Sequence, residues 1–277
     1  MSEAAPATRR PATEPPKTTA VVIRAAGTNC DAELVRALQL AGAATSVAHL
    51  DAITADPSPL EGAGIIAFPG GFSFGDDIAS GRIFAMRVRQ RLASHIRAAA
   101  DRGTCIVGIC NGFQILVQAG LLPGDTTQTV SLTTNAENRF IDRWVRVGVN
   151  TESACVWTKG LETGATPDTA MLPVANGEGR FTASNTTLRR LEADNLVAIR
   201  YAEDVNGSAN RIAGITDTTG RILGLMPHPE RYFDWNRHPF WTRLPAEAKA
   251  ATPPGLRLFK NAVEAAAEAG LAHTASP

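Results

Sequence analysis

The sequence lacks the main features of nucleic-acid-binding, membrane-spanning and disulfide-stabilised proteins. Its 27 Lys and Arg balance 27 Asp and Glu, so no net charge attracts it to nucleic acid or to an anionic membrane. It contains no run of about 18 apolar residues, which excludes a transmembrane helix. The four cysteines show neither C-x-x-C spacing nor a nearby pair of histidines, so no disulfide framework and no metal site are predicted. We therefore expect a protein of the reducing cytoplasm.

A secretion signal and a nucleotide-binding loop are also missing. Residues 1–18 carry several prolines among small and charged residues and no apolar stretch, so we expect a disordered tail there. No Gly-x-x-x-x-Gly-Lys-Ser/Thr loop occurs, and nothing therefore indicates ATP binding by this chain. The rest of the 277 residues is long enough for one domain with a sizeable core, which we place at 19–272.

Short apolar runs alternate with longer amphipathic runs, which is typical of βαβ units around a parallel sheet. A helix after the first strand would be capped by Asn29 or Asp31. Shorter, mixed runs between 140 and 215 indicate added antiparallel strands. We therefore predict an α/β fold with a mostly parallel central sheet, helices on both faces and added antiparallel strands. The predicted strands are 20–24, 45–50, 65–68, 105–109 and 222–226, and the other predicted helices are 83–101, 113–119 and 256–269.

The strongest local signal for chemistry is Gly108-Ile-Cys-Asn-Gly112, where a predicted strand gives way to a helix. Glycines on either side of Cys110 remove β-carbons that would clash in a sharp strand-to-helix turn. The start of the next helix favours a thiolate, and the main-chain N–H of Asn111 is placed to bind an oxyanion. A small, buried, purely structural Cys110 is the alternative. Three cysteines without such a turn are interpreted as core residues: Cys30, Cys105 and Cys155.

A nucleophilic cysteine needs a base, and the segment Met226 to Arg231 offers one. Pro229 favours an extended backbone at His228, and residues two apart in an extended segment point the same way. We therefore expect Glu230 to hold the imidazole of His228 at the carboxyl edge of the sheet, near the cysteine. A surface histidine in a proline-rich loop is the alternative. The remaining histidines have no carboxylate so placed and are interpreted as structural or solvent-facing: His49, His95, His238 and His273.

Two glycines follow another predicted strand, in the segment Pro69 to Asp76. Because Gly70 and Gly71 lack side chains, the main chain there can approach a ligand closely, and one of its N–H groups is a candidate to complete an oxyanion hole with Asn111. A plain turn is the alternative.

These three elements, in this order, resemble the class I, triad-type glutamine amidotransferase domains, in which Gly-x-Cys-x-Gly-x-Gln precedes a late His-Pro-Glu. Gln114 completes the first of those patterns. Finer matches resemble one branch, the glutaminase subunits of phosphoribosylformylglycinamidine synthase. So many separated matches are specific as a set. The matching segments are Gly27 to Asp31, Pro69 to Asp76, Gly120 to Gly124, Gly177 to Phe181, Asn206 to Ser208 and Met226 to Arg231.

The resemblance implies a flavodoxin-like fold and gives roles to individual residues. Cys110 would be the nucleophile, His228 the general base and acid, and Glu230 the partner that orients the imidazole. Four further residues are weaker candidates for oxyanion binding or for contact with the substrate: Gly70, Gly71, Asn111 and Gln114.

The same resemblance implies hydrolysis of glutamine to glutamate and ammonia through a thioester on Cys110. The ammonia would pass to a separate synthetase subunit, which uses ATP and Mg²⁺ to convert formylglycinamide ribonucleotide to formylglycinamidine ribonucleotide in purine biosynthesis. A small bridging subunit is the other expected partner. No cofactor or metal is implied for this chain itself.

The sequence departs from the family pattern at three places. Asn176 stands where the family usually has His, Phe74 replaces Tyr, and residues 233–254 look like an insertion.

Two other functions stay open. A cysteine hydrolase of the same fold commonly has His directly after the nucleophile, which Asn111 argues against. A non-catalytic scaffold would have lost the triad, whereas all three residues are present.

Overall fold

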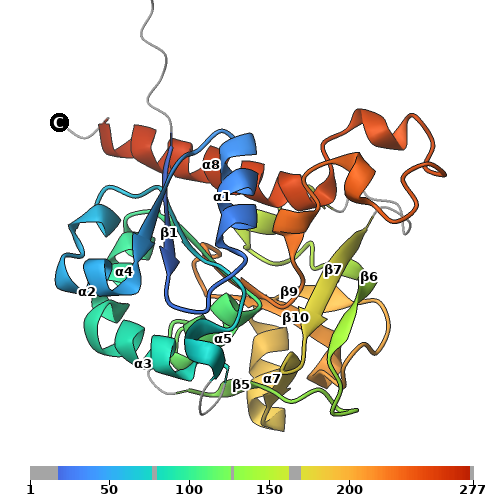
Figure 1. Cartoon of the computed structure of the whole chain (residues 1–277), viewed down its shortest axis with the longest axis horizontal. Helices are drawn as coiled ribbons and strands as arrows, with labels where there is room; N and C mark the ends of the chain where they lie inside the picture. The colour runs from blue at the N-terminus through green and yellow to red at the C-terminus, as the bar shows by residue number, and fades with distance from the viewer. Residues whose placement is uncertain (1–17, 77–79, 126–127, 162–169, 275–277) are drawn as a thin grey trace, which may run out of the picture.

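A nine-stranded mixed sheet forms the centre of the computed structural model, which describes residues 18–76, 80–125, 128–161 and 170–274 (Figure 1). The strand order is β2-β1-β3-β4-β11-β10-β9-β6-β7, and β5 and β8 form a separate pair. The strands are β1 (Thr19–Arg24), β2 (Ala44–His49), β3 (Ile65–Phe68), β4 (Cys105–Ile109), β5 (Val130–Thr133), β6 (Ile141–Val149), β7 (Met171–Asn176), β8 (Arg180–Ala183), β9 (Val197–Tyr201), β10 (Ile212–Thr216) and β11 (Ile222–Leu225).

The sheet has a parallel half and an antiparallel half. Strands β2, β1, β3, β4 and β11 pair in parallel, and the pairs from β11 through β10, β9 and β6 to β7 are antiparallel. Every residue of β3, β4 and β11 is buried, as expected for strands covered on both faces. Since β4 pairs with both β3 and β11, the carboxyl ends of these three strands meet at one edge.

Helices cover both faces of the sheet (Figure 1). Helix α1 packs on β1, β2 and α8, whereas α5 packs on β3, β4, β11 and α3. The predicted fold class is therefore confirmed. The helices are α1 (Asp31–Leu40), α2 (Leu50–Ala55), α3 (Arg82–Arg91), α4 (Ala93–Asp101), α5 (Asn111–Gln118), α7 (Asn185–Ala193) and α8 (Pro254–Thr274).

Two details of the predicted helices are wrong. The single helix predicted at 83–101 is two helices, separated at Leu92, which has φ −121° and is fully buried. The break lets α3 and α4 each turn an apolar stripe to the core, which periodicity alone does not reveal. The N-cap of α1 is Cys30 rather than Asn29 or Asp31, and no side chain caps it. Asp31 already lies inside the helix and pairs with Arg24 at 2.8 Å.

Residues 233–254 lie apart from the sheet, as short turns that project at the upper right of Figure 1. Aromatic rings at their base pack on one another, with Tyr232 against Trp144, Trp235 and His238. His238 is buried in this cluster, in agreement with a structural role. Whether the segment is an insertion, and where the domain ends, stay predictions.

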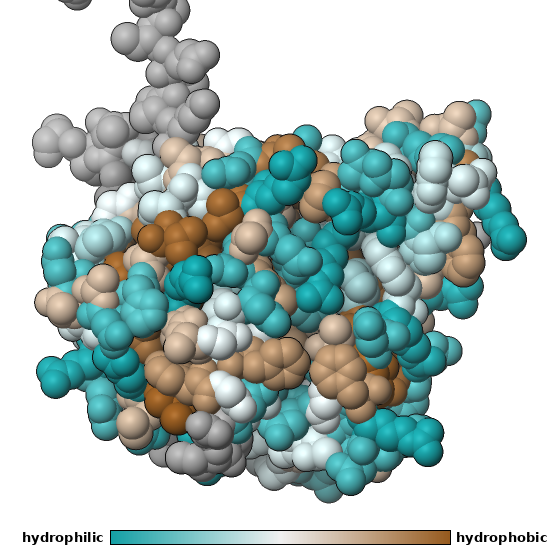
Figure 2. All heavy atoms as spheres, in the orientation of Figure 1, coloured by the Kyte–Doolittle hydropathy of each residue, from teal (hydrophilic) through white to brown (hydrophobic). Residues whose placement is uncertain are grey.

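The surface and the ends complete this description. On the face drawn in Figure 2, hydrophilic side chains predominate and hydrophobic ones gather in separate patches. None of the helices in the described ranges is long and apolar enough to cross a membrane. The tail predicted at 1–18 lies outside the described residues except for Thr18.

Candidate active site

Cys110 sits between β4 and α5 in a strained backbone conformation, with φ 53° and ψ −106°. Positive φ is uncommon for a residue with a side chain and here turns the chain sharply from strand to helix. Cys110 is 7% exposed, and the first N–H groups of α5 have no partners from within that helix. The turn thus places the sulfur beside the positive end of α5.

Close packing explains the two glycines that flank this turn. A β-carbon on Gly112 would overlap the carbonyl oxygen of Phe68, at the end of β3. A β-carbon on Gly108 would overlap the main chain of Gly112 itself. Because main-chain atoms cannot yield as the end of a flexible side chain does, the turn requires glycine at both positions, as the sequence predicts.

His228 and Glu230 form a buried pair directly after β11. Nδ1 of His228 lies 2.6 Å from Oε1 of Glu230, and the two residues are 1% and 0% exposed. The predicted pairing is present, but its predicted cause is wrong. Pro229 begins a 3-10 turn, Pro229–Arg231, and Glu230 reaches the ring from that turn rather than from an extended segment.

The surroundings of His228 favour its charged form. Burial lowers the pKa of His228, but the Glu230 carboxylate, together with the nearby sulfurs of Cys110 and Cys30, raises it well above its usual value. An imidazolium stabilised in this way is the natural partner of a thiolate. The pair can therefore take the proton of a thiol and keep it beside the sulfur.

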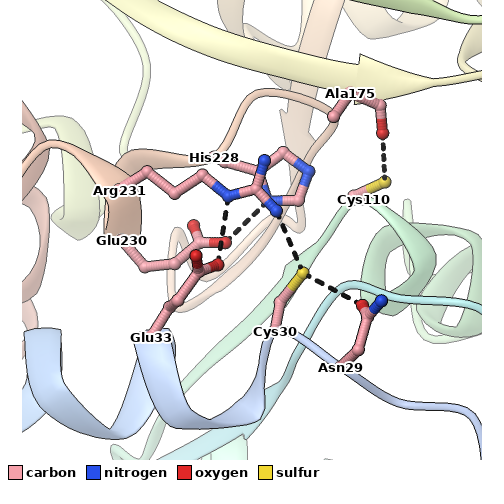
Figure 3. A network of polar contacts seen from close by, with 8 residues as sticks. All are labelled: Asn29, Cys30, Glu33, Cys110, Ala175, His228, Glu230 and Arg231. Atoms are coloured by element: carbon pink, nitrogen blue, oxygen red, sulfur yellow. Dashed lines mark hydrogen bonds and ion pairs between the residues drawn. The ribbon is translucent and has the colours of Figure 1, made fainter.

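The thiol and the imidazole are close but are not hydrogen-bonded to each other. Sγ of Cys110 contacts the carbonyl oxygen of Ala175 at 3.7 Å, and Nε2 of His228 is buried without a hydrogen-bond partner in the part of the chain described (Figure 3). Gly70 lies where these groups meet, since a β-carbon there would fall 2.9 Å from Cε1 of His228 and 3.4 Å from Cβ of Cys110. Catalytic hydrogen bonds often tighten only when substrate binds.

The candidate oxyanion residues lie around the same point. Gly71 has φ 131°, and a β-carbon there would lie 2.6 Å from the main-chain nitrogen of Asn29, so this position also requires glycine. Asn111 directly follows Cys110 as the first residue of α5, where a main-chain N–H has no partner within the helix. The structure thus brings Gly70, Gly71 and Asn111 together beside Cys110, and their roles stay predictions.

A chain of buried hydrogen bonds crosses the site. The hydroxyl of Ser73 donates to Oδ1 of Asn111 at 2.7 Å, and Nδ2 of Asn111 donates to Oε1 of Gln114 at 3.0 Å. Nε2 of Gln114 then donates to the carbonyl oxygen of Glu178 at 2.6 Å. Both polar ends of Gln114 are therefore occupied. Its arrangement suits a residue that positions Glu178 better than one that contacts substrate directly.

Several of the site residues line one pocket of about 230 Å³. Its wall includes Cys110, His228, Gly71 and Gln114, together with polar residues from several loops. A buried nucleophile, an oriented base and a cavity of this size can perform acyl transfer on a small substrate.

Comparison with known proteins identifies the family. Residues 17–264 match the family model of the CobB/CobQ-like glutamine amidotransferase domain. A phosphoribosylformylglycinamidine synthase subunit PurQ from Dehalococcoides mccartyi is 41% identical over 90% of this chain and 97% of its own length. The chain belongs to the PurQ family of glutamine amidotransferases.

Other relatives agree with this assignment. The PurQ subunit of Methanococcus maripaludis is 37% identical over 88% of this chain and 97% of its own. Among solved structures, PurLQS from Thermotoga maritima matches with a TM-score of 0.67 and 30% identity, covering 90% of this chain and 98% of that chain. A GMP synthase protein from Thermoplasma acidophilum shares the fold, at 16% identity and a TM-score of 0.58, over 94% of this chain and 100% of that chain.

In this PurQ-family chain Cys30 is buried, as predicted, and it is also part of the site. Although only 5% exposed, it lines the pocket and accepts a hydrogen bond from Nη2 of Arg231 at 3.3 Å (Figure 3). Nε of Arg231 donates to Glu33 at 3.0 Å, so the guanidinium ties α1 to the segment that carries His228. Cys105 and Cys155 are buried in the core as expected, and burial raises the pKa of Cys105 to about 11.

Several site residues stand in the matched motifs but receive no role from the sequence. Cys30 stands in the segment from Gly27 to Asp31, and Asp76 and Glu178 stand in two others. Cys30, His228 and Glu230 also place possible metal-ligand atoms within 4.8 Å of one another. The carboxylate is already bonded to Nδ1, however, which is the arrangement of an orienting group.

Proposed function

We propose that this chain is the glutaminase subunit of a phosphoribosylformylglycinamidine synthase. The observation that carries the proposal is the geometry at the carboxyl edge of the sheet. There a strained turn holds Cys110, and the Glu230-bound imidazole of His228 faces the same pocket. The PurQ relatives supply the reaction to which this geometry is assigned.

The reaction begins with transfer of the Cys110 proton to Nε2 of His228. The sulfur then attacks the side-chain amide carbon of glutamine, and the main-chain N–H groups near Gly71 and Asn111 bind the oxyanion. The carbon–nitrogen bond breaks as His228 returns the proton to the leaving nitrogen. The products of this half are ammonia and a glutamyl thioester on Cys110.

Water completes the cycle. His228 takes a proton from the water molecule as its oxygen attacks the thioester carbon. The carbon–sulfur bond then breaks to release glutamate, and the proton on His228 returns to the Cys110 sulfur. Glu230 does not exchange protons in these steps. It holds the tautomer and orientation of the ring, and its charge stabilises the imidazolium that forms twice in each cycle.

The ammonia is used by a separate synthetase subunit, which converts formylglycinamide ribonucleotide to formylglycinamidine ribonucleotide in the cytoplasm. That subunit, rather than this chain, would bind ATP and Mg²⁺, and a small third subunit would bridge the two. The likeness to a chain of the PurLQS structure supports such an assembly.

Reconstitution with the synthetase subunit tests this proposal. Wild-type chain should support synthase activity with glutamine, and Cys110→Ala should abolish it while leaving activity with added ammonium salt unchanged, because only the ammonia source is lost. Glutamine-dependent activity that survives the substitution, or no glutamine-dependent activity in the wild-type complex, would refute the proposal.

A further inference from the structure

Two cysteines, rather than one, line the active-site pocket. Cys30 and Cys110 both reach this cavity, and each is the residue directly before a helix, α1 or α5. Cys105 and Cys155 instead lie in the core, where burial raises the pKa of each thiol. No bond-forming step of the proposed glutaminase reaction uses Cys30. The second thiol of the pocket is therefore available for chemistry of its own.

Charged and polar groups surround the sulfur of Cys30 (Figure 3). It accepts a hydrogen bond from Nη2 of Arg231 at 3.3 Å, and its S–H donates to Oδ1 of Asn29 at 3.5 Å. The imidazole of His228 is a second positive group, because the sulfurs of Cys30 and Cys110 are both close enough to raise its pKa. Cysteines that reach a cavity beside positive groups are the reactive ones, whereas cysteines packed among apolar side chains are inert. Cys30 has the surroundings of a reactive thiol.

Gly70 lies between the two cysteines. A β-carbon at Gly70 would be 3.3 Å from Sγ of Cys30 and 3.4 Å from Cβ of Cys110, so these two atoms are no further apart than the sum of those distances. Rotation about a Cα–Cβ bond moves a sulfur atom by about 3 Å, and a glycine presents no side chain that would block this movement. We therefore expect side-chain rotation, with a small approach of the loop between β1 and α1, to bring the two sulfurs into bonding distance.

The imidazole of His228 is placed to serve both sulfurs. Cε1 of the ring would be 2.9 Å from the same β-carbon position, so the ring and the two cysteines surround one point. Nε2 of His228 is buried and has no hydrogen-bond partner among the described residues. It can deliver a proton to an oxygen atom that leaves either sulfur.

We propose that Cys30 and Cys110 form a reversible oxidation site for hydroperoxides, in which Cys30 captures the oxidised nucleophile as a disulfide. The sulfur of Cys110 attacks one oxygen of hydrogen peroxide, the oxygen–oxygen bond breaks, and the other oxygen leaves as water. The sulfur of Cys30 then attacks the resulting sulfenic acid, and the sulfur–oxygen bond breaks as His228 protonates the hydroxide that leaves. The peroxide is reduced to two water molecules, which take up the protons of both thiols, and the two thiols are oxidised to one disulfide.

Capture by Cys30 protects the nucleophile while it stops the proposed reaction. A sulfenic acid that stays exposed to peroxide is oxidised further to a sulfinic acid, which thiols do not reduce, whereas a disulfide is returned to two thiols by a dithiol reductant. The inference goes beyond the proposed glutaminase function, and the link between the two side chains forms without glutamine.

Peptide mass spectrometry without reductant tests the inference on the full chain after complete reaction with a small excess of hydrogen peroxide. Wild-type chain should give one linked pair of peptides that contain Cys30 and Cys110, and dithiothreitol should release both with free thiols. In Cys30→Ser, which keeps a polar atom beside Arg231, Cys110 should carry a sulfinic acid that dithiothreitol does not reverse. Cys155→Ala is the matched control, since Cys155 is buried outside this pocket, and it should give the same linked peptides as wild type. Wild-type chain in which Cys110 reaches the sulfinic acid without a link to Cys30 would overturn the inference.

Recovery of activity is the second readout. Each chain is treated with peroxide, freed of it and combined with the synthetase, and its glutamine-dependent activity is compared with that of the same chain before treatment. Dithiothreitol should restore most of the activity of wild type and of Cys155→Ala, but less than about a tenth of that of Cys30→Ser. Equal recovery by wild type and Cys30→Ser would overturn the inference. A chain that forms the link but never releases ammonia from glutamine would refute the glutaminase proposal and leave the oxidation site standing.

Discussion

Replacement of Glu230 by Gln tests how much the buried carboxylate contributes to the reaction. The variant keeps the size of the side chain and an oxygen facing Nδ1 of His228, but it removes a charge 2.6 Å from the ring. With an effective dielectric constant of about 20, two unit charges about 4 Å apart attract by ~4 kcal/mol. Because part of that energy offsets the burial of both groups, we expect a loss of about 2–4 kcal/mol in stabilisation of the imidazolium. The corresponding decrease in kcat is about 30-fold to 1000-fold.

Glutamine-dependent ammonia release measures this effect, and Glu33→Gln supplies the control. Glu33 is an acid of the same neighbourhood that pairs with Arg231 instead of the imidazole and is partly exposed. Its removal should change kcat by less than about threefold, as for other exposed ion pairs. A Glu230→Gln chain with kcat within about threefold of wild type would show that the carboxylate does not stabilise the charged ring, and the reasoning from burial and charge would fail.

Three other outcomes are expected. Gly112→Ala should reduce the free energy of unfolding, measured in urea, by about 3 kcal/mol or more, because its β-carbon meets the carbonyl oxygen at the end of β3. Gly62→Ala is the control, and since its β-carbon would lie in open space it should change this free energy by less than about 1 kcal/mol. Because the pKa of His228 is raised in the folded state, the charged imidazole contributes stability that is fully present below about pH 6.5 and is lost as pH rises through the raised pKa. The difference in free energy of unfolding between wild type and Glu230→Gln should therefore shrink above about pH 6.5. A difference that grows with pH would contradict a raised pKa. Cys30→Ala removes a sulfur that raises the pKa of His228, so alkylation of Cys110 by iodoacetamide near pH 7 should slow by about two- to tenfold. An unchanged rate would show that Cys30 does not influence the imidazole.

Features that depend on neighbouring residues could be predicted from the sequence. The run from Cys105 to Ile109 predicts a buried strand, and the glycines at 108 and 112 predict a sharp turn into a helix, because each signal is complete within a few residues. The same holds for the pairing of His228 with Glu230, although the backbone between them follows a turn.

Features that depend on distant packing could not be predicted. The break at Leu92 depends on how two successive apolar stripes pack on the core. The spacing of apolar residues within 83–101 does not reveal it. Cys30 has no strand-to-helix turn like that of Cys110, and only the fold shows that it lines the pocket and that Arg231, far along the chain, donates to its sulfur. The hydrogen bond from Gln114 to the carbonyl oxygen of Glu178 could not be predicted either, because it depends on how the turn between β7 and β8 packs against α5.

The neighbouring positions of β4 and β11 in the sheet bear on how the enzyme acquires activity during synthesis. The nucleophile leaves the ribosome long before the histidine, and β11 can join β4 only after nearly all of the other strands exist. An incomplete chain therefore carries a thiol without its base. On the proposed mechanism, nascent or truncated copies would not hydrolyse glutamine, and the ability to release ammonia would arise only once β11 has joined β4.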